Sequence, residues 1–184
     1  MNWAWYQEKI KAAGRPIRVL NLFGYTGGAT LACLAAGASV THVDASKGMV
    51  AWAKENARSS GLADAPIRWI VDDALKFVQR EVRRGKKYNG IILDPPAYGR
   101  GANGEKWVLE ENINELITLC GQLLEGSNSF LVLNLYSMGL SALLARSIVR
   151  QLVGDCTGEQ FGELYFTDSY GKSLPLGVYY RLWR

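Results

Sequence analysis

An unbroken apolar run that ends in a carboxylate and two prolines most constrains the fold of this chain. It reads IILDPP over residues 91–96 and continues as AYG to residue 99. A strand buried on both faces shows no polar alternation, so the run predicts a central strand of a parallel sheet. Proline lacks the N–H group that a sheet ladder requires, so Pro95 and Pro96 must follow the strand. Asp94 is therefore expected at the carboxyl end of a central strand, where open α/β sheets bind ligands.

Further strands alternate with helical patterns along the chain. Strands are predicted at residues 17–23, 40–43, 67–71, 89–94 and 130–135, and helices at residues 3–12, 28–37, 47–57, 74–82, 113–124 and 140–152. This alternation predicts an α/β fold with a doubly wound, mostly parallel sheet and helices on both faces. The last two predicted strands, residues 164–166 and 178–183, follow one another directly, which predicts an antiparallel edge. Residues 99–104 are predicted to form a mobile loop.

The composition indicates one globular domain. Of 184 residues, 48% are hydrophobic and 21% are charged, and the net charge of +4 permits a polyanionic partner without requiring one. No signal peptide and no apolar segment of membrane-spanning length are recognised, so we expect a cytoplasmic protein without a membrane partner. The three cysteines lie far apart in the sequence and show no Cys-x-x-Cys pairing, so neither a metal site nor a disulfide framework is expected.

A glycine turn and three acidic strand ends predict a site for a nucleoside. The turn, GYTGG at residues 24–28, joins the first strand to a helix, whose N-terminus suits a carboxylate or phosphate. Asp44 ends the second strand and is placed to accept both ribose hydroxyls. Asp72 and Asp73 end the third strand, within reach of an adenine amino group. Asp44 and Asp73 could also serve only as helix caps, but their combination with the turn and Asp94 favours the ligand site.

The turn differs from the Gly-x-Gly-x-x-Gly pattern of dinucleotide-binding proteins and resembles motif I of class I methyltransferases instead. The segment at residues 94–98 resembles motif IV of nucleic-acid methyltransferases that use S-adenosylmethionine. Four segments in order, VLNLFGYTGG (19–28), THVDAS (41–46), IVDDA (70–74) and LDPPAYG (93–99), resemble successive motifs of one bacterial family. That family comprises the S-adenosylmethionine-dependent methyltransferases related to the large-subunit ribosomal RNA methyltransferases of the 5-methylcytosine and 7-methylguanine types.

The resemblance implies a Rossmann-like fold whose seven-stranded sheet is mostly parallel with an antiparallel last strand, and S-adenosylmethionine as cofactor. It implies that the first segment binds the methionine part through its backbone, Asp44 the ribose and Asp73 the adenine. The expected cofactor-binding residues are Asn21, Phe23, Gly24, Tyr25, Thr26, Gly27, Gly28, Asp44, Ala45, Ser46, Asp72, Asp73 and Ala74. Family members usually carry N-terminal segments that help to bind RNA. We expect residues 1–184 to be one catalytic domain that lacks them, either a fragment or a short homologue.

Asp94, Pro95, Pro96 and Tyr98 are the expected catalytic residues. Methyl transfer from a sulfonium chiefly requires positioning of the acceptor. The Asp94 carboxylate and the Pro95 carbonyl are placed to hold an amino group, and Tyr98 to stack on an unstacked base. We therefore expect a methyltransferase that acts on a base nitrogen of RNA, in particular ribosomal RNA.

Several alternatives remain open. Formation of 5-methylcytosine requires a cysteine nucleophile, whereas Cys33 and Cys120 fall on apolar helix faces. A nucleotide-dependent oxidoreductase is disfavoured by the glycine spacing, and a non-catalytic cofactor-binding module by the intact motif at residues 94–96. The basic residues between 76 and 87 form either a solvated helix face or phosphate contacts, and Asn134 is either structural or part of the pocket. His42, inside a buried strand, is assigned no catalytic role.

Overall fold

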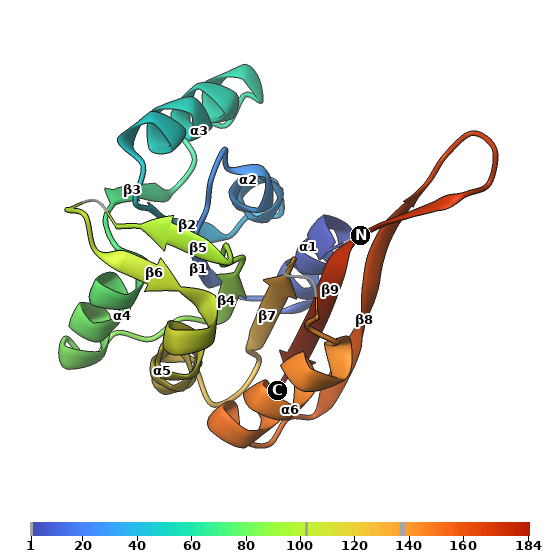
Figure 1. Cartoon of the computed structure of the whole chain (residues 1–184). Coiled ribbons are helices and arrows are strands. Elements are labelled where there is room, and N and C mark those ends of the chain that lie inside the picture. The colour runs from blue at the N-terminus through green and yellow to red at the C-terminus, as the bar shows by residue number, and fades with distance from the viewer. Residues whose placement is uncertain (1, 102, 137–138) are drawn as a thin grey trace.

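The computed structural model describes residues 2–101, 103–136 and 139–184 and contains one seven-stranded sheet (Figure 1). Its strand order is β3-β2-β1-β4-β7-β9-β8. The first five strands in this order pair in parallel, and β9 pairs antiparallel with both β7 and β8. The predicted fold class is confirmed, although the antiparallel strand lies second from the edge. The strands are β1 (Arg18–Leu22), β2 (Ser39–Asp44), β3 (Ile67–Val71), β4 (Gly90–Leu93), β7 (Phe130–Leu135), β8 (Gly158–Thr167) and β9 (Ser173–Trp183).

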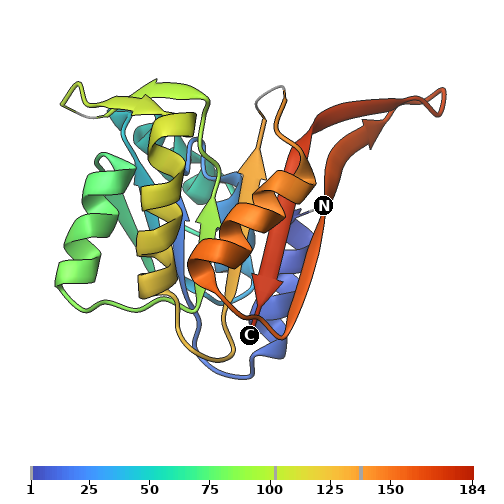
Figure 2. The ribbon, with the colours of Figure 1, turned by 60° about the horizontal axis from the view of Figure 1, so that its bottom comes forward.

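Helices cover both faces of the sheet, as Figures 1 and 2 show. On one face lie α1 (Asn2–Ala12), α2 (Gly28–Ala35) and α3 (Lys47–Ser59); on the other lie α4 (Ala74–Arg83), α5 (Leu109–Leu123) and α6 (Ala142–Val153). Every residue of β4 and β7 is buried, as expected of parallel strands covered on both sides. Among the described residues no helix is both long and apolar enough to cross a bilayer.

Helix α1 packs under the middle of the sheet through aromatic side chains. Trp5 and Tyr6 are buried, and their rings lie 5.6 Å and 6.4 Å from the ring of Phe130 on β7. An isolated helix of eleven residues is marginal in water, so this packing is what stabilises α1. As a consequence, Asn2 at the start of the helix reaches the carboxyl end of β7, where it hydrogen-bonds to Asn134.

The loop predicted at residues 99–104 is shorter in the structure, because residues 99 and 100 belong to a strand; residues 101, 103 and 104 lie in the connection to the next strand, and residue 102 lies outside the described residues. Strands β5 (Tyr98–Arg100) and β6 (Lys106–Val108) pair antiparallel and form a small hairpin over the carboxyl edge of the sheet, here called the flap (Figure 2). Trp107 anchors the flap, because its Nε1 donates to the carbonyl of Pro96 at 2.7 Å and its ring lies 4.9 Å from that of Phe23. The flap is therefore tied to the segment that follows β4.

Strands β8 and β9 extend further than predicted and form a long hairpin that projects from the body of the molecule (Figure 1). Near its tip the large side chains of Tyr165, Phe166 and Tyr170 are exposed. The base of the hairpin is different, because β9 there lies against β7 and its Tyr180 and Leu182 are fully buried. The hairpin thus joins the core at one end and borders the carboxyl edge of the sheet at the other.

Candidate functional site

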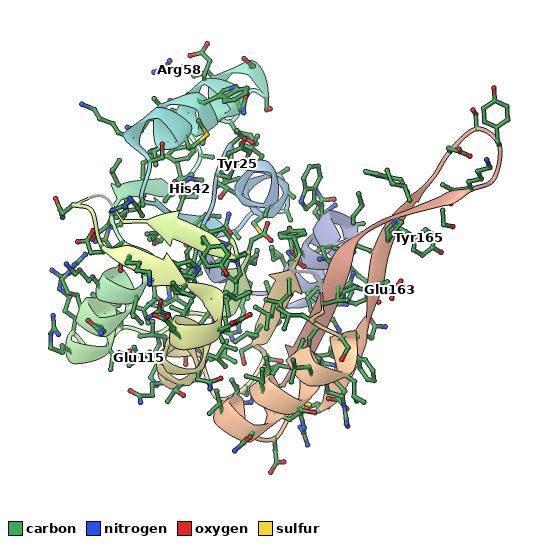
Figure 3. The ribbon with its side chains drawn as sticks, in the orientation of Figure 1. Tyr25, His42, Arg58, Glu115, Glu163 and Tyr165 are labelled. Atoms are coloured by element: carbon green, nitrogen blue, oxygen red, sulfur yellow. The ribbon has the colours of Figure 1, made fainter. Side chains whose placement is uncertain are left out.

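Two cavities meet at the carboxyl edge of the sheet. The first, of about 430 Å³, lies under the flap beside the ends of β2 and β4 and is lined by Asp44, Asp73, Asp94 and Trp107 among others. The second, of about 720 Å³, lies between the glycine turn, the start of α1 and the β8–β9 hairpin, and Figure 3 labels three of its lining residues, Tyr25, Glu163 and Tyr165. Both volumes suit a cofactor or another small ligand. Four residues line both cavities: Phe23, Tyr25, Asp94 and Tyr136.

The glycine turn has the strained backbone of a ligand-binding loop. Phe23 and Tyr25 have φ angles of 56° and 47°, in the left-handed region that non-glycine residues rarely adopt. A Cβ on Gly24 would lie 2.4 Å from the imidazole ring of His42, so only glycine fits there. Helix α2 begins directly after the turn without a side-chain cap, which leaves its first N–H groups for a ligand. Gly24, Thr26, Gly27 and Gly28 all line the second cavity.

A buried polar chain supports the turn from below. Nδ2 of Asn21 donates to Oγ1 of Thr30 at 2.9 Å, and this hydroxyl lies 2.9 Å from Nδ1 of His42. Burial lowers the pKa of His42 to about 4, an effect that Asp44 partly opposes, so the imidazole is neutral at pH 7. Asn21 borders the second cavity, but its amide nitrogen is engaged within the protein.

Asp44 is held rigidly at the end of β2. Its Oδ2 accepts the backbone N–H of Tyr25 at 2.9 Å, and its Oδ1 accepts that of Ser46 at 2.9 Å. A carboxylate offers about four acceptor positions, so about two remain for a ligand in the first cavity. Ala45 and Ser46 line the same cavity. Ser46 also caps α3 through a hydrogen bond from Met49 N to its Oγ.

The adjacent aspartates Asp72 and Asp73 face different surroundings. Asp73 caps α4 by accepting the N–H of Lys76 at 2.9 Å, and it lines the first cavity together with Ala74. Asp72 forms an ion pair with Arg80 and is not among the lining residues of either cavity. The structure therefore brings Asp73 to the site and leaves Asp72 outside it.

Asp94 lies at the junction of the two cavities. Its Oδ1 is buried and has no hydrogen-bond partner among the described residues. Burial raises the pKa of this carboxyl, while the side chains of Tyr136 and Asn134, as nearby donors, oppose the rise. A buried acceptor without a partner is costly, which makes this oxygen a candidate for contact with a ligand.

Of the other residues of the predicted catalytic motif, one lines the first cavity and two line neither cavity. Pro96 lines the first cavity, and its carbonyl accepts the hydrogen bond from Trp107. Pro95 is buried and lines neither cavity. Tyr98 lies on the flap with 74% of its surface exposed and also lines neither. Aromatic rings beside Asp94 come instead from Tyr25 and Tyr136.

Several residues at the site have no role in the sequence-based prediction. Tyr136 has the same kind of signal as Asp94, since it follows the end of a buried strand, β7. Trp107 has no such signal, because its position depends on the flap. Asn2 and Arg181 come from the two ends of the described chain, and only the folded sheet brings them together at the second cavity.

Most of the basic segment 76–87 is engaged within the protein. Lys76 pairs with Glu105 of the flap at 2.6 Å, Arg80 pairs with Asp72, and Arg84 pairs with Glu81 at 3.1 Å. Lys87 donates to the carbonyl of Gln122 at 2.7 Å. This pattern agrees with a helix face that stabilises the fold.

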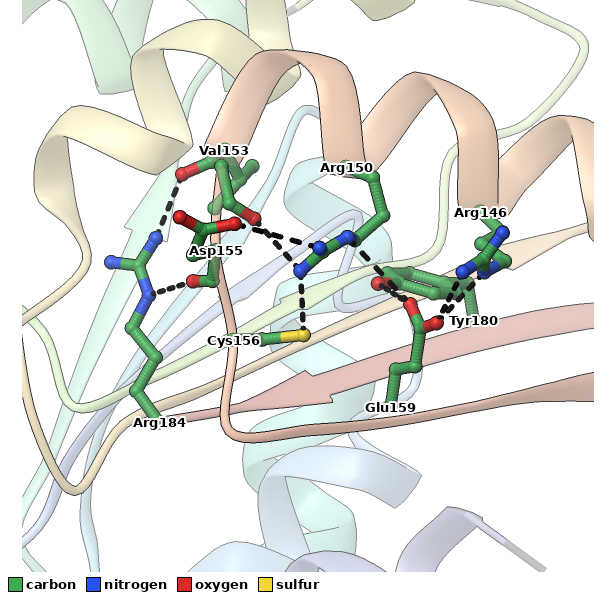
Figure 4. A network of polar contacts seen from close by, with 9 residues as sticks. Arg146, Arg150, Val153, Asp155, Cys156, Glu159, Tyr180 and Arg184 are labelled. Atoms are coloured by element: carbon green, nitrogen blue, oxygen red, sulfur yellow. Dashed lines mark hydrogen bonds and ion pairs between the residues drawn. The ribbon is translucent and has the colours of Figure 1, made fainter.

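The cysteines lie away from Asp94. Cys33 and Cys120 are fully buried in apolar clusters, and burial raises the pKa of both thiols, that of Cys33 to about 12. Cys156 accepts a hydrogen bond from Arg150 within a polar network between α6 and β8 (Figure 4). Neighbouring Thr157 pairs with Trp183, opposite the start of β7, so Cys156 lies at the other edge of the sheet from Asp94.

The first cavity fits the nucleoside part of a cofactor. It offers Asp44 with free acceptor positions, Asp73 at its rim, and the apolar rings of Phe23 and Trp107. The uncapped start of α2 lies beside the second cavity, through Gly28 and Ala29. The unpartnered oxygen of Asp94 lies where the two cavities join. A ligand with a nucleoside at one end and a charged group at the other matches this arrangement.

Comparison with known proteins agrees with these features. A family model described as S-adenosylmethionine-dependent methyltransferase matches residues 1–151. A ribosomal RNA large subunit methyltransferase I from Aeromonas salmonicida is 32% identical over 166 residues, which cover 89% of this chain and 40% of that protein. The crystal structure of an S-adenosylmethionine-dependent methyltransferase from Agrobacterium tumefaciens superposes with a TM-score of 0.93 at 42% identity, covering 98% of this chain and 60% of that one.

A more distant structure supports the fold alone. The magnesium protoporphyrin IX methyltransferase from Synechocystis, described with bound S-adenosylmethionine, is 16% identical and has a TM-score of 0.66 over 100% of this chain and 78% of that one. The chain spans less than half the length of the curated relatives it matches.

Proposed function

The chain belongs to the family of S-adenosylmethionine-dependent methyltransferases, and from this premise we propose that it methylates a base nitrogen of ribosomal RNA. S-adenosylmethionine is the cofactor, and it supplies a methyl group that its sulfonium charge has already activated. The residues of the chain therefore have to position the acceptor and exclude water. RNA as substrate is supported by relatives named as ribosomal RNA large subunit methyltransferases.

In this proposal the first cavity holds the nucleoside part of the cofactor. Asp44 accepts the ribose hydroxyls with the acceptor positions that its two backbone contacts leave free. Asp73 accepts a hydrogen bond from the adenine amino group with its second oxygen, since its first oxygen caps α4. The glycine turn and the start of α2 take the charged methionine end. Asp72, which is paired with Arg80, supports the site from outside.

The single observation that carries the assignment of a nitrogen acceptor is the buried Oδ1 of Asp94 between the two cavities, which has no hydrogen-bond partner in the described part of the chain. A carboxylate oxygen accepts the N–H of an amino group and so fixes the direction of the nitrogen lone pair. Tyr25 and Tyr136 line both cavities together with Asp94 and so bring two aromatic rings to this position. Stacking of a base on such a ring contributes about 1–3 kcal/mol, comparable to the cost of unstacking it.

The 5-methylcytosine alternative requires a thiolate that attacks the base beside Asp94. Cys33 and Cys120 are buried in the core with raised pKa values, and Cys156 lies at the opposite edge of the sheet. Replacing all three cysteines by Ala or Ser is therefore expected to leave methyl transfer intact in the folded protein. RNA that contains 5-fluorocytosine is expected to form no trapped covalent complex with the wild-type protein.

The direct test is to incubate the protein with bacterial ribosomal RNA and S-adenosylmethionine labelled in its methyl group. Digestion to nucleosides and mass spectrometry then identify the product. We expect the label on an exocyclic or ring nitrogen. A labelled 5-methylcytidine, or activity lost with one correctly folded cysteine variant, would contradict the proposal.

A further inference from the structure

A chain of buried side-chain hydrogen bonds runs from the last strand of the sheet to the first helix. Arg181 on β9 donates from Nε, at 2.8 Å, and from a terminal nitrogen to Oδ1 of Asn2. Nδ2 of Asn2 donates in turn to Oδ1 of Asn134 at 2.6 Å. Asn2 and Asn134 are 6% exposed and Arg181 is 7% exposed. All three side chains border the second cavity.

Arg181 sets the direction of every hydrogen bond in this chain. A guanidinium has N–H donors and no acceptor, so the side-chain oxygen of Asn2 must face Arg181. The amide nitrogen of Asn2 then faces Asn134, whose oxygen must face back. The amide nitrogen of Asn134 is left on the other side, as a donor. An asparagine amide has nearly the same shape in both orientations, so only its partners decide which way it points.

Asn134 lies beside Asp94, and both residues line the second cavity. Leu93 of β4 pairs with Leu133 of β7, so the next residues, Asp94 and Asn134, are neighbours at the carboxyl ends of these strands. Burial has the largest effect on the pKa of Asp94 and raises it, whereas donation by Tyr136 and then by Asn134 favours the charged form and lowers the pKa. In the reverse orientation the oxygen of Asn134 would repel the carboxylate and favour its neutral form.

We propose that Arg181 and Asn2 are positioning residues that hold Asn134 as a hydrogen-bond donor toward Asp94, whose carboxylate accepts a hydrogen bond from the amino group of the methyl acceptor. The proposal rests on the role of Asp94 in the proposed function. Among the described residues, the other groups that influence or adjoin Asp94 are Tyr136 after β7 and Tyr6 of α1, whose hydroxyl also interacts with Asn134, with Asp44 and Asp73 across the first cavity. None of these groups carries an amide that could present either its oxygen or its nitrogen to Asp94. Arg181 therefore acts through the orientation of the Asn134 amide.

The test is a titration of the Asp94 carboxyl by carbon-13 NMR, with its resonance identified by its loss in Asp94→Asn. The neutral, nearly isosteric variants Asn2→Leu and Asn134→Leu are compared with the wild type. Each is expected to raise the midpoint of Asp94 by about one to two pH units, the value of a hydrogen bond to a charged group. The double variant is expected to shift it no further than Asn134→Leu alone, because both act through one amide.

Arginine variants complete the experiment. Arg181→Lys keeps a donor-only cation and is expected to retain the wild-type midpoint, whereas Arg181→Met is expected to raise it. Arg184→Met is the matched control, because the side chain of Arg184 donates to the carbonyls of Val153 and Asp155 at the far edge of the sheet and to no other described residue. If Arg181→Met does not fold, Asn2→Leu and Asn134→Leu decide the question. An unchanged midpoint in folded Asn2→Leu would overturn the proposal.

The acid limb of the pH profile of kcat/KM should move with the NMR midpoint in the same variants. The titration needs no substrate, so it separates the two proposals. A raised midpoint in a protein that transfers no methyl group to RNA would contradict the proposed function and support the positioning. An unchanged midpoint in an active protein would contradict the positioning alone.

Discussion

Asp44 shows how one side chain can shape a site and remain available to a ligand. By accepting the N–H groups of Tyr25 and Ser46, its carboxylate joins the glycine turn to the segment that precedes α3. These contacts fix the carboxylate before a ligand arrives, which lowers the entropy cost of binding. The role of Asp44 in affinity is therefore testable apart from catalysis.

Asp44→Ala is expected to weaken binding of S-adenosylmethionine by about 1.5–3 kcal/mol, the value of a hydrogen bond to a charged group. Isothermal titration calorimetry measures the change. Asp64→Ala is the control, because Asp64 is an exposed residue in the turn before β3. Full affinity in the folded Asp44→Ala protein would contradict the assignment of the first cavity to the ribose.

The buried His42 is expected to make the free energy of unfolding depend on pH in the acidic range. Its pKa is about 4 in the folded protein, because burial disfavours the charged ring, against about 6.5 in an unfolded chain. The neutral ring therefore stabilises the fold above pH 6.5, and this contribution is lost as the pH falls from 6.5 to 4. The loss amounts to about 3 kcal/mol.

Urea unfolding at several pH values between 7 and 4 checks this prediction. In His42→Gln the free energy of unfolding should fall less steeply over this range than in the wild type, because no imidazole has to be protonated. Carboxyl groups that titrate in the same range are common to both proteins and cancel in the comparison. Parallel curves for the two proteins would show that His42 is not the group responsible.

At the scale of elements, the flap is the feature that only the structure reveals. Its strands have three residues each, too short for an alternation of apolar and polar side chains to show. Its position depends on Trp107, which is buried against Phe23 and bound to the carbonyl of Pro96. The flap therefore connects the roof of the first cavity to the segment that carries Asp94.

Trp107→Phe keeps an aromatic ring in the flap but removes the N–H group that meets the Pro96 carbonyl. We expect a loss of stability of about 1–3 kcal/mol, because the carbonyl loses its partner. Hydrogen exchange should accelerate at residues 98–101 and 103–108, and S-adenosylmethionine should bind more weakly. Trp52→Phe, on the exposed side of α3, is the matched control. Equal exchange in the flap of both variants would contradict the anchoring role.

The sequence predicted the elements whose burial is complete and missed those whose position depends on partners far away in the chain. The runs that form β4 and β7 are almost entirely apolar, so their place at the centre of the sheet could be predicted from the sequence. Asp44, Asp73 and Asp94 were readable as the ends of such strands. The outward direction of Tyr98 was not, and neither was the contact between Asn2 and Arg181, which requires the completed sheet.

At the scale of the whole molecule, the carboxyl edge of the sheet carries two cavities that different elements enclose. The ends of β2 and β4 and the flap enclose the first cavity, whereas α1, the end of β7 and the β8–β9 hairpin border the second. Asp94 belongs to both. A ligand in the first cavity contacts elements from several parts of the chain, so its binding should stabilise the fold as a unit.

S-adenosylmethionine or its demethylated product at about one hundred times its Kd should add about 2.7 kcal/mol to the free energy of unfolding. For a domain of this size that raises Tm by about 5–11 °C. Differential scanning calorimetry measures the shift, and NAD at the same concentration is the control. A larger shift with NAD would contradict the cofactor assignment and favour an oxidoreductase.

The role of Asp94 in holding the methyl acceptor is tested by Asp94→Ala, with cofactor binding and methyl transfer measured on the same preparation. Calorimetry is expected to show nearly wild-type affinity for S-adenosylmethionine, since Asp44, Asp73 and the glycine turn are intact. Transfer of labelled methyl groups to ribosomal RNA should fall by about 10²–10³-fold, as for the loss of a group that positions the reacting atom. Normal transfer by the folded variant would show that Asp94 does not position the methyl acceptor.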